Sequence, residues 1–211
     1  PAALGGLGLD SSDLDRHIGI AIGILGVSER LSDLLGAALV FQRYSRLVVE
    51  CNRRPTAPDF VAAVSDGTPV PGNAGVSAGE RAHRAGEISE PYHREIVSRL
   101  DERQAAGRPA ILVSMHSFTP SLLARPSQRP WHVGLCYGAD RRFTVPVLDA
   151  LAMEPGLNVG RNEPYGVNMA ADYSIPVHGE ERGLPYVEVE IRQDLIASTD
   201  AQRQRAERIA R

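Results

Sequence analysis

The segment that most constrains this fold is a short apolar run, Ala110–Met115, interrupted only by Ser114 and followed at once by His116. Such a run is typical of a strand that is covered on both faces, as in parallel sheets. The preceding residues 77–107 have a helical period instead. The apolar stripe of that helical period consists of Ile88, Tyr92, Ile96, Val97 and Leu100. A helix that leads into a fully apolar strand indicates an α/β protein.

The rest of the chain also alternates between the two patterns. We expect further strands at Ala38–Gln42, Arg46–Cys51, Val133–Tyr137, Asn158–Gly160 and Tyr186–Arg192. Helices are expected at Asp13–Leu35, with a break near Gly26, at Phe143–Met153 and in the polar segment that closes at Arg211. The proline- and glycine-rich stretch 54–77 is expected to lack regular structure. Together these elements predict a three-layer α/β sandwich with a mostly parallel central sheet.

Size and composition exclude several classes of protein. A chain of 211 residues is long enough for one core, so we expect a single domain over residues 1–211. The net charge of -3 and the aromatic content of 5% argue against a nucleic-acid partner. No apolar run approaches the roughly 20 residues of a membrane span, so we expect no membrane partner. Cys51 and Cys136 lie in apolar runs and are interpreted as buried free thiols, which suits the cytoplasm.

Two predicted strand ends carry residues that could do chemistry. Asn52 and Arg53 follow an apolar run, and an amide beside a guanidinium fork suits a carboxylate ligand; the alternative is a surface arginine and a turn-forming asparagine. His116 lies at the carboxyl edge of the predicted sheet, where ligands gather in open α/β folds. A histidine there can be a metal ligand or a general base, or a hydrogen-bonded structural residue.

A third segment places two carboxylates on one face of a strand. Glu188, Glu190 and Arg192 alternate with aliphatic residues and so point the same way. If the strand is covered on both faces, the carboxylates must be paired, protonated or metal-linked; at a sheet edge they would be a solvated face. A buried glutamate with a raised pKa is a candidate general base. In the loops, Arg129, His132 and Glu163 are candidates for the walls of a substrate site.

Five blocks in order carry a resemblance to a known family. They are Tyr44–Arg53, Ser114–Pro120, Arg129–Gly134, Asn162–Tyr165 and His178–Ile196. Over nearly the whole chain they resemble the N-formylglutamate amidohydrolase family. The resemblance implies a zinc-exopeptidase (phosphorylase/hydrolase)-like fold and a cytoplasmic hydrolase of histidine catabolism.

The resemblance also implies roles for individual residues. His116 is similar to the family's zinc ligand, and Glu190 to the base that activates water. Arg46 resembles the residue that stabilises the oxyanion, while Asn52 and Arg53 resemble the pair that holds substrate. The implied substrate is an N-acyl amino acid such as N-formylglutamate, which would be cleaved to formate and glutamate.

The sequence departs from the family pattern at two places. Relatives carry a further strand, ending in an acidic residue and a histidine, upstream of the segment at which this chain begins. We therefore expect a native sequence that extends before Pro1, with a metal-binding histidine there. Many relatives also have aspartate where this chain has Ala21. If that aspartate is a ligand, zinc binds poorly here.

Three alternatives stay open at this point. The substrate of the enzyme could be another N-acyl amino acid or a peptide, because the loops 54–77 and 117–131 are expected to shape the specificity pocket. The protein could instead be a non-catalytic descendant that binds an acidic small molecule or peptide, or a structural protein without a ligand. The sequence leaves the oligomeric state undetermined.

Overall fold

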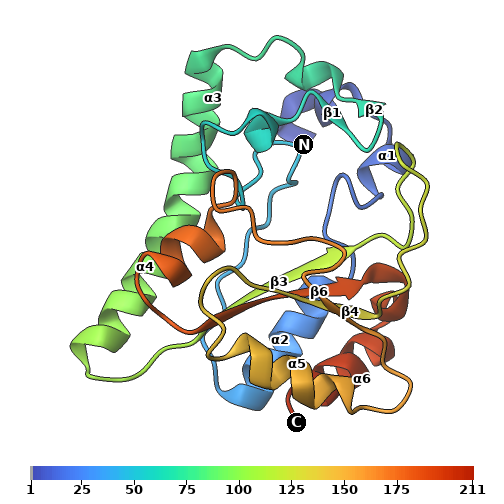
Figure 1. The fold of residues 1–211 in the computed structure, drawn as a ribbon. Coiled ribbons are helices and arrows are strands. Elements are labelled where there is room, and N and C mark those ends of the chain that lie inside the picture. Colours follow the sequence, from blue (N-terminus) through green and yellow to red (C-terminus); the bar gives the residue numbers. More distant parts are fainter. Residues whose placement is uncertain (1) are drawn as a thin grey trace.

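A four-stranded sheet forms the centre of the molecule in the computed structural model, which describes residues 2–211 (Figure 1). The strands are β3 (Leu112–Phe118), β4 (Val133–Cys136), β5 (Val159–Arg161) and β6 (Tyr186–Arg192), in the order β3-β6-β4-β5. β3 runs parallel to β6 and β4 parallel to β5, whereas β4 and β6 are antiparallel. The sheet is therefore mostly parallel, as predicted.

Helices and long loops cover the two faces of this sheet. On one side lie α2 (Ile24–Leu35), α5 (Thr144–Ala152) and α6 (Thr199–Ile209) (Figure 1). α3 (Ala78–Arg84) continues through a π-helical turn into α4 (Glu90–Ala105), and the two run down the left of the molecule in Figure 1. The predicted α/β sandwich is confirmed, together with the helical segments predicted at 77–107, at 143–153 and near the C-terminus. None of the helices in residues 2–211 is both long and apolar enough to span a membrane.

The remaining elements are short. They are α1 (Ser11–Leu14), β1 (Val64–Ser65), β2 (Thr68–Pro69), the 3-10 segments Ala2–Gly8, Pro58–Val61, Pro71–Asn73 and Gln193–Ile196, and the π-helical segments Ala85–Ser89 and Ser174–Glu180. β1 and β2 form a separate antiparallel pair. The stretch 54–77 thus contains some regular structure, although we expected none.

The apolar face of the sheet forms the main core. Val187, Val189 and Ile191 alternate along β6 and are buried against residues of α2, α5 and α6. A second cluster, built around Phe60 and Leu47, lies under the long loops away from that face. Because alternate residues of a strand point to opposite sides, the side chains between these valines and isoleucine point to the other face.

The predicted helix Asp13–Leu35 is confirmed only from Ile24 onwards, and the predicted break near Gly26 is wrong. The chain leaves helical geometry after Leu14 and re-enters it only at Ile24. Gly23 has a φ of 74°, and a Cβ there would overlap the carbonyl oxygen of Ile196. A positive φ and this close approach both require glycine, so the helix begins after Gly23. Gly26 stays inside α2.

The predicted strands Ala38–Gln42 and Arg46–Cys51 are also wrong. The second segment is instead a series of turns, with hydrogen bonds from Val48 N to Ser45 O and from Arg53 N to Glu50 O. Its valines are buried all the same, since they pack in the second cluster with Phe60. An apolar run can be buried without joining a sheet when turns satisfy its backbone groups.

The strand predicted at Ala110–Met115 is shifted and is not covered on both faces. β3 begins at Leu112 and extends through Phe118, because it pairs with β6 along its whole length. It lies at one edge of the sheet, with Ile111 50% and Val113 37% exposed. His116 consequently lies within the strand and not directly after it.

Candidate functional site

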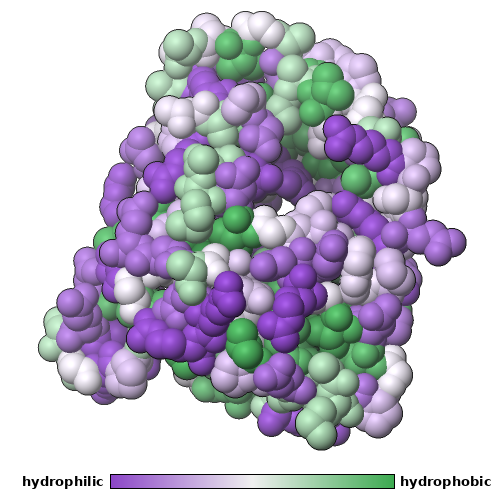
Figure 2. Space-filling model, viewed as in Figure 1, coloured by the Kyte–Doolittle hydropathy of each residue, from purple (hydrophilic) through white to green (hydrophobic). Residues whose placement is uncertain are grey.

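The register of β3 and β6 builds the centre of the candidate site. Ser114 lies opposite Glu188 and His116 opposite Glu190, and partners in a parallel pair point to the same face. That face lies opposite the apolar core. Figure 2 shows a hollow in the middle of the molecule, rimmed largely by hydrophilic residues. The sequence prediction that Glu188 and Glu190 share a face is thus consistent with the observed strand.

Both carboxylates are deeply buried, because β6 lies between β3 and β4. Glu188 is 4% and Glu190 6% exposed, which settles the choice between a covered strand and a solvated edge. Burial raises the pKa of Glu190 to about 7, opposed by the nearby charge of His116 and reinforced by that of Glu188. Burial also raises the pKa of Glu188. The Oε2 atom of Glu190 is buried without a hydrogen-bond partner among the described residues.

His116 lies beside these carboxylates. Its Nε2 atom is 3.0 Å from the hydroxyl of Ser114 and 3.7 Å from Oε2 of Glu188. The second distance is too long for a hydrogen bond and leaves an electrostatic contact. The ring is therefore positioned by Ser114. When it is protonated, its positive charge interacts favourably with the buried carboxylates.

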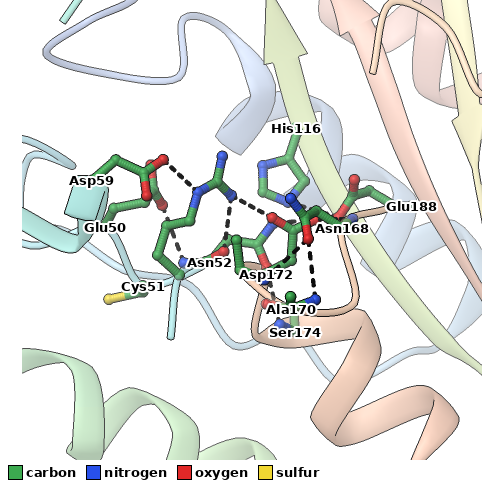
Figure 3. A network of polar contacts seen from close by, with 12 residues as sticks. Glu50, Cys51, Asn52, Asp59, His116, Asn168, Ala170, Asp172, Ser174 and Glu188 are labelled. Atoms are coloured by element: carbon green, nitrogen blue, oxygen red, sulfur yellow. Dashed lines mark hydrogen bonds and ion pairs between the residues drawn. The ribbon is translucent and has the colours of Figure 1, made fainter. Parts of the chain in front are cut away.

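Asn52 reaches the same centre from the turn segment. Its Nδ2 atom donates to Glu188 Oε2 at 3.4 Å, while its Oδ1 atom accepts from the backbone N of Ser174 at 3.0 Å. Figure 3 shows Asn52, His116 and Glu188 converging with Asp172. The amide is held at both ends, so its orientation toward Glu188 is fixed.

Arg53 lies next to this centre but is already engaged. Its Nε atom donates to Asp59 at 2.7 Å, and its Nη1 atom donates to Asp172 at 2.6 Å and to the backbone oxygen of Asn52 at 3.0 Å. Burial raises the pKa of Asp172, although the Asn168 backbone N–H and Arg53 act against it. Most of the guanidinium donors of Arg53 are thus used in contacts within the protein.

Arg46 forms a more exposed pair. Its guanidinium is 2.6 Å from Glu50 and 45% exposed. Burial alone would raise the pKa of Glu50, but Arg46 and the backbone N–H of Asn52 outweigh it and lower that pKa. Arg46 is therefore a partly exposed cation that is held by its ion pair with Glu50.

Arg129 lies deeper, at the end of the loop that follows β3. It is buried, and its Nη1 atom donates to the hydroxyl of Tyr165 at 2.8 Å. The guanidinium lies over the rings of Tyr165 and Phe118. Its charge acts weakly against the burial that raises the pKa of Glu190.

Glu163 and His132 have different positions. The backbone of Glu163 lies against β4, where a Cβ at Gly134 would overlap its carbonyl oxygen, and Gly134 is paired with Glu190. His132 instead accepts a hydrogen bond from Asn158 N at 3.1 Å, and the charges that act on it come from Arg192 and other residues outside the centre. The structure therefore brings Glu163 near the centre and does not bring His132 to it.

A buried histidine pair beneath the site was missed by sequence reasoning. His93 Nε2 donates to the backbone oxygen of Cys51 at 2.8 Å, and His93 Nδ1 lies 3.0 Å from His178 Nε2. Since a carbonyl can only accept, His93 must accept from His178. Burial lowers the pKa of both rings to about 4, so both are neutral near pH 7. The pair supports the turn that carries Asn52.

Asp172 was missed as well. It lies in an irregular loop without periodicity, and the only signal in the sequence is its charge among small residues. As for metal binding, residues 2–211 contain no group of three or more His, Cys, Asp or Glu side chains arranged to hold an ion. His116 and Glu188 supply two donors at most.

Comparison with known proteins agrees with this description. A model of the N-formylglutamate amidohydrolase family matches residues 1–197. The crystal structure of gene product Atu2144 from Agrobacterium tumefaciens is similar at 36% identity and TM-score 0.93, covering 100% of this chain and 82% of that one. N-formylglutamate amidohydrolase from Ralstonia eutropha JMP134 shares the fold at 17% identity and TM-score 0.58, covering 89% of this chain and 78% of that one. No curated protein matches the chain.

The sheet, its covering layers and the glutamates beside His116 define an α/β protein with a polar centre on one face of the sheet. The chain belongs to the N-formylglutamate amidohydrolase family. Amidohydrolases cleave amide C–N bonds, and family membership implies a small-molecule substrate. The resemblance stated from the sequence is thus confirmed.

Proposed function

We propose that this protein hydrolyses the amide bond of an N-acyl amino acid, with N-formylglutamate as the first substrate to test. The observation that carries the proposal is Glu190, a fully covered carboxylate with a pKa raised to about 7 and an unpartnered oxygen. A carboxylate with a pKa near the working pH is suited to general base catalysis. Family membership supplies the type of bond and the class of substrate.

In the proposed mechanism Glu190 takes a proton from the attacking water. As water adds to the amide carbonyl, the negative charge that develops on the carbonyl oxygen is stabilised by Arg46. Glu190 then returns the proton to the leaving nitrogen, so that formate and an amino acid leave. Burial is the main cause of the raised pKa of Glu190, and the neighbouring carboxylate of Glu188, which Asn52 contacts, acts in the same direction.

Zinc is the metal that the family resemblance implies, with His116 as its ligand. When bound, zinc would polarise the carbonyl and lower the pKa of water. A catalytic zinc usually has three protein ligands, and the described residues do not form such a set. The proposed mechanism therefore uses only side chains of this protein. Zinc dependence, a cytoplasmic location and a role in histidine catabolism stay predictions.

A ligand-binding protein without catalysis is the second candidate function. It is favoured by Ala21, which is exposed where many relatives have aspartate, and by the incomplete donor set. Such a protein would bind an acidic small molecule at the same hollow. The two candidates differ in turnover and in metal content.

The test is hydrolysis of a panel of N-acyl amino acids by the full-length native protein, with zinc measured in the same samples by elemental analysis. We expect release of formate from N-formylglutamate. His116→Ala should lower both zinc content and turnover if His116 is a ligand. Binding without turnover across the panel, with or without added zinc, would favour the second candidate.

A further inference from the structure

Arg129 differs from the other arginines at the site because it is buried without an acidic partner. Arg129 is only 8% exposed, yet it forms no ion pair with any carboxylate in residues 2–211. Arg46 is paired with Glu50, whereas Arg53 is paired with both Asp59 and Asp172. A buried cation without a counter-charge is costly, so proteins usually pair it.

The hydrogen bonds of Arg129 leave part of its fork free. Nη1 donates to the backbone oxygen of Thr119 at 3.3 Å and to the Tyr165 hydroxyl at 2.8 Å. Nε and Nη2 have no hydrogen-bond partner in the part of the chain that the structure describes. The ring of Tyr165, 4.7 Å away, and the ring of Phe118, 5.9 Å away, hold the guanidinium plane in place. A pre-oriented fork with free donors is suited to a carboxylate.

Tyr165 adds a second donor at the same point. Its hydroxyl oxygen accepts from Arg129, which leaves the hydroxyl proton available for another acceptor. The residue is 40% exposed. Phe118 lies on the same face of β3 as His116, so this pair of donors borders the space above the glutamates.

We propose that Arg129 and Tyr165 form the subsite for a carboxylate of the substrate, and that Arg53 is a positioning residue. Arg53 would then hold the Asn52 turn against Asp172 through its Nη1 atom. The assignment rests on the proposed amidohydrolase function for the identity of the substrate. It predicts a ligand with a free carboxylate that reaches Arg129 while its amide lies at Glu190.

The experiment measures binding without catalysis, by isothermal titration of glutarate, a dicarboxylate that has no amide to cleave. We expect Arg129→Gln to bind glutarate about 10- to 100-fold more weakly than the wild type, since a charge-assisted pair is lost. Tyr165→Phe keeps the ring and should bind it about 3- to 10-fold more weakly. Arg141→Gln is the matched control, because Arg141 also lies over a tyrosine ring, that of Tyr137, but is exposed.

Two results would overturn the assignment. One is wild-type protein that binds no glutarate at millimolar concentration; the other is unchanged affinity in Arg129→Gln with loss of binding in Arg53→Lys. Thermal unfolding of each variant establishes that it is folded, and Tyr165→Phe keeps the test decisive if Arg129→Gln does not fold. Glutarate binding that depends on Arg129, in a protein that hydrolyses no N-acyl amino acid, would support the subsite and contradict the proposed function.

Discussion

At the scale of single residues, the proposed chemistry depends on a glutamate that is hard to ionise. Glu190 lies between β3 and β4 on a strand covered on both faces, and its neighbour Glu188 adds a second carboxylate two residues away. Removing a carboxylate from water favours its protonated form, which is why the pKa of Glu190 rises to about 7. The same burial that makes Glu190 a candidate base should also destabilise the protein when Glu190 ionises.

Replacing Glu190 by Gln should therefore stabilise the protein at high pH. Between the ordinary pKa of 4.5 and the folded value of about 7, the folded state holds more protons than the unfolded state. The free energy of unfolding thus falls as the pH rises through this window. We expect Glu190→Gln to exceed the wild type by up to about 3 kcal/mol at pH 8 and to match it near pH 4.

Urea unfolding at several pH values measures this difference. Glu87→Gln is the matched control, because Glu87 is exposed and should behave like the wild type at every pH. A gain in Glu190→Gln that does not change with pH would show that the ionisation of Glu190 is not its cause.

At the scale of elements, close backbone approaches position the site. Gly134 in β4 allows the backbone of Glu163 to lie directly on the sheet beside Glu190. A side chain at this point would push the 162–165 segment away from the sheet. This close approach explains why a small residue is needed in a strand that is otherwise apolar.

Gly134→Ala should lower the free energy of unfolding by about 1–3 kcal/mol, because the new Cβ overlaps the Glu163 carbonyl oxygen. Gly86→Ala is the matched control: a Cβ at Gly86 meets nothing within 4 Å, so no loss is expected. Chemical denaturation compares the two variants. Equal stability of Gly134→Ala and the wild type would mean that the 162–165 segment does not pack as described.

The buried pair of His93 and His178 joins α4 to the π-helical segment Ser174–Glu180. Burial lowers the pKa of both rings to about 4, from an ordinary 6.5. The unfolded state therefore takes up more protons between these values, and stability is lost as the pH falls from 6.5 towards 4. We expect the double variant His93→Gln/His178→Gln to be less stable near neutral pH, with a flatter dependence on pH in this window. Thermal melts across the window measure the slope, and an unchanged slope would contradict the neutral pair.

At the scale of the whole molecule, the sequence predicted the layers better than the connections. The period of two along Tyr186–Arg192 was sufficient to place Glu188 and Glu190 on one face. Their position beside His116 depends on the β3–β6 register, which pairs residues about 74 positions apart and leaves no local pattern. The run Arg46–Cys51 was mistaken for a strand because burial, and not pairing, determines its composition.

The candidate site was likewise predictable only in part. His116, Asn52 and Glu190 were found because each stands out from an apolar neighbourhood. Asp172 was not, since it acts through its partner Arg53, and that partnership is formed only by the fold. For the same reason the sequence could not distinguish an engaged arginine from a free one.

The central claim is that Glu190 activates water for amide hydrolysis, and formate release from N-formylglutamate as a function of pH tests it most directly. For the wild type we expect kcat/KM to rise with pH and to level off above an apparent pKa of about 7. Above pH 7, Glu190→Gln should be slower by about 10²- to 10⁴-fold while remaining folded, and the difference should shrink as the pH falls below 7 and the wild type loses its ionised base. Wild-type rates in Glu190→Gln would contradict the claim.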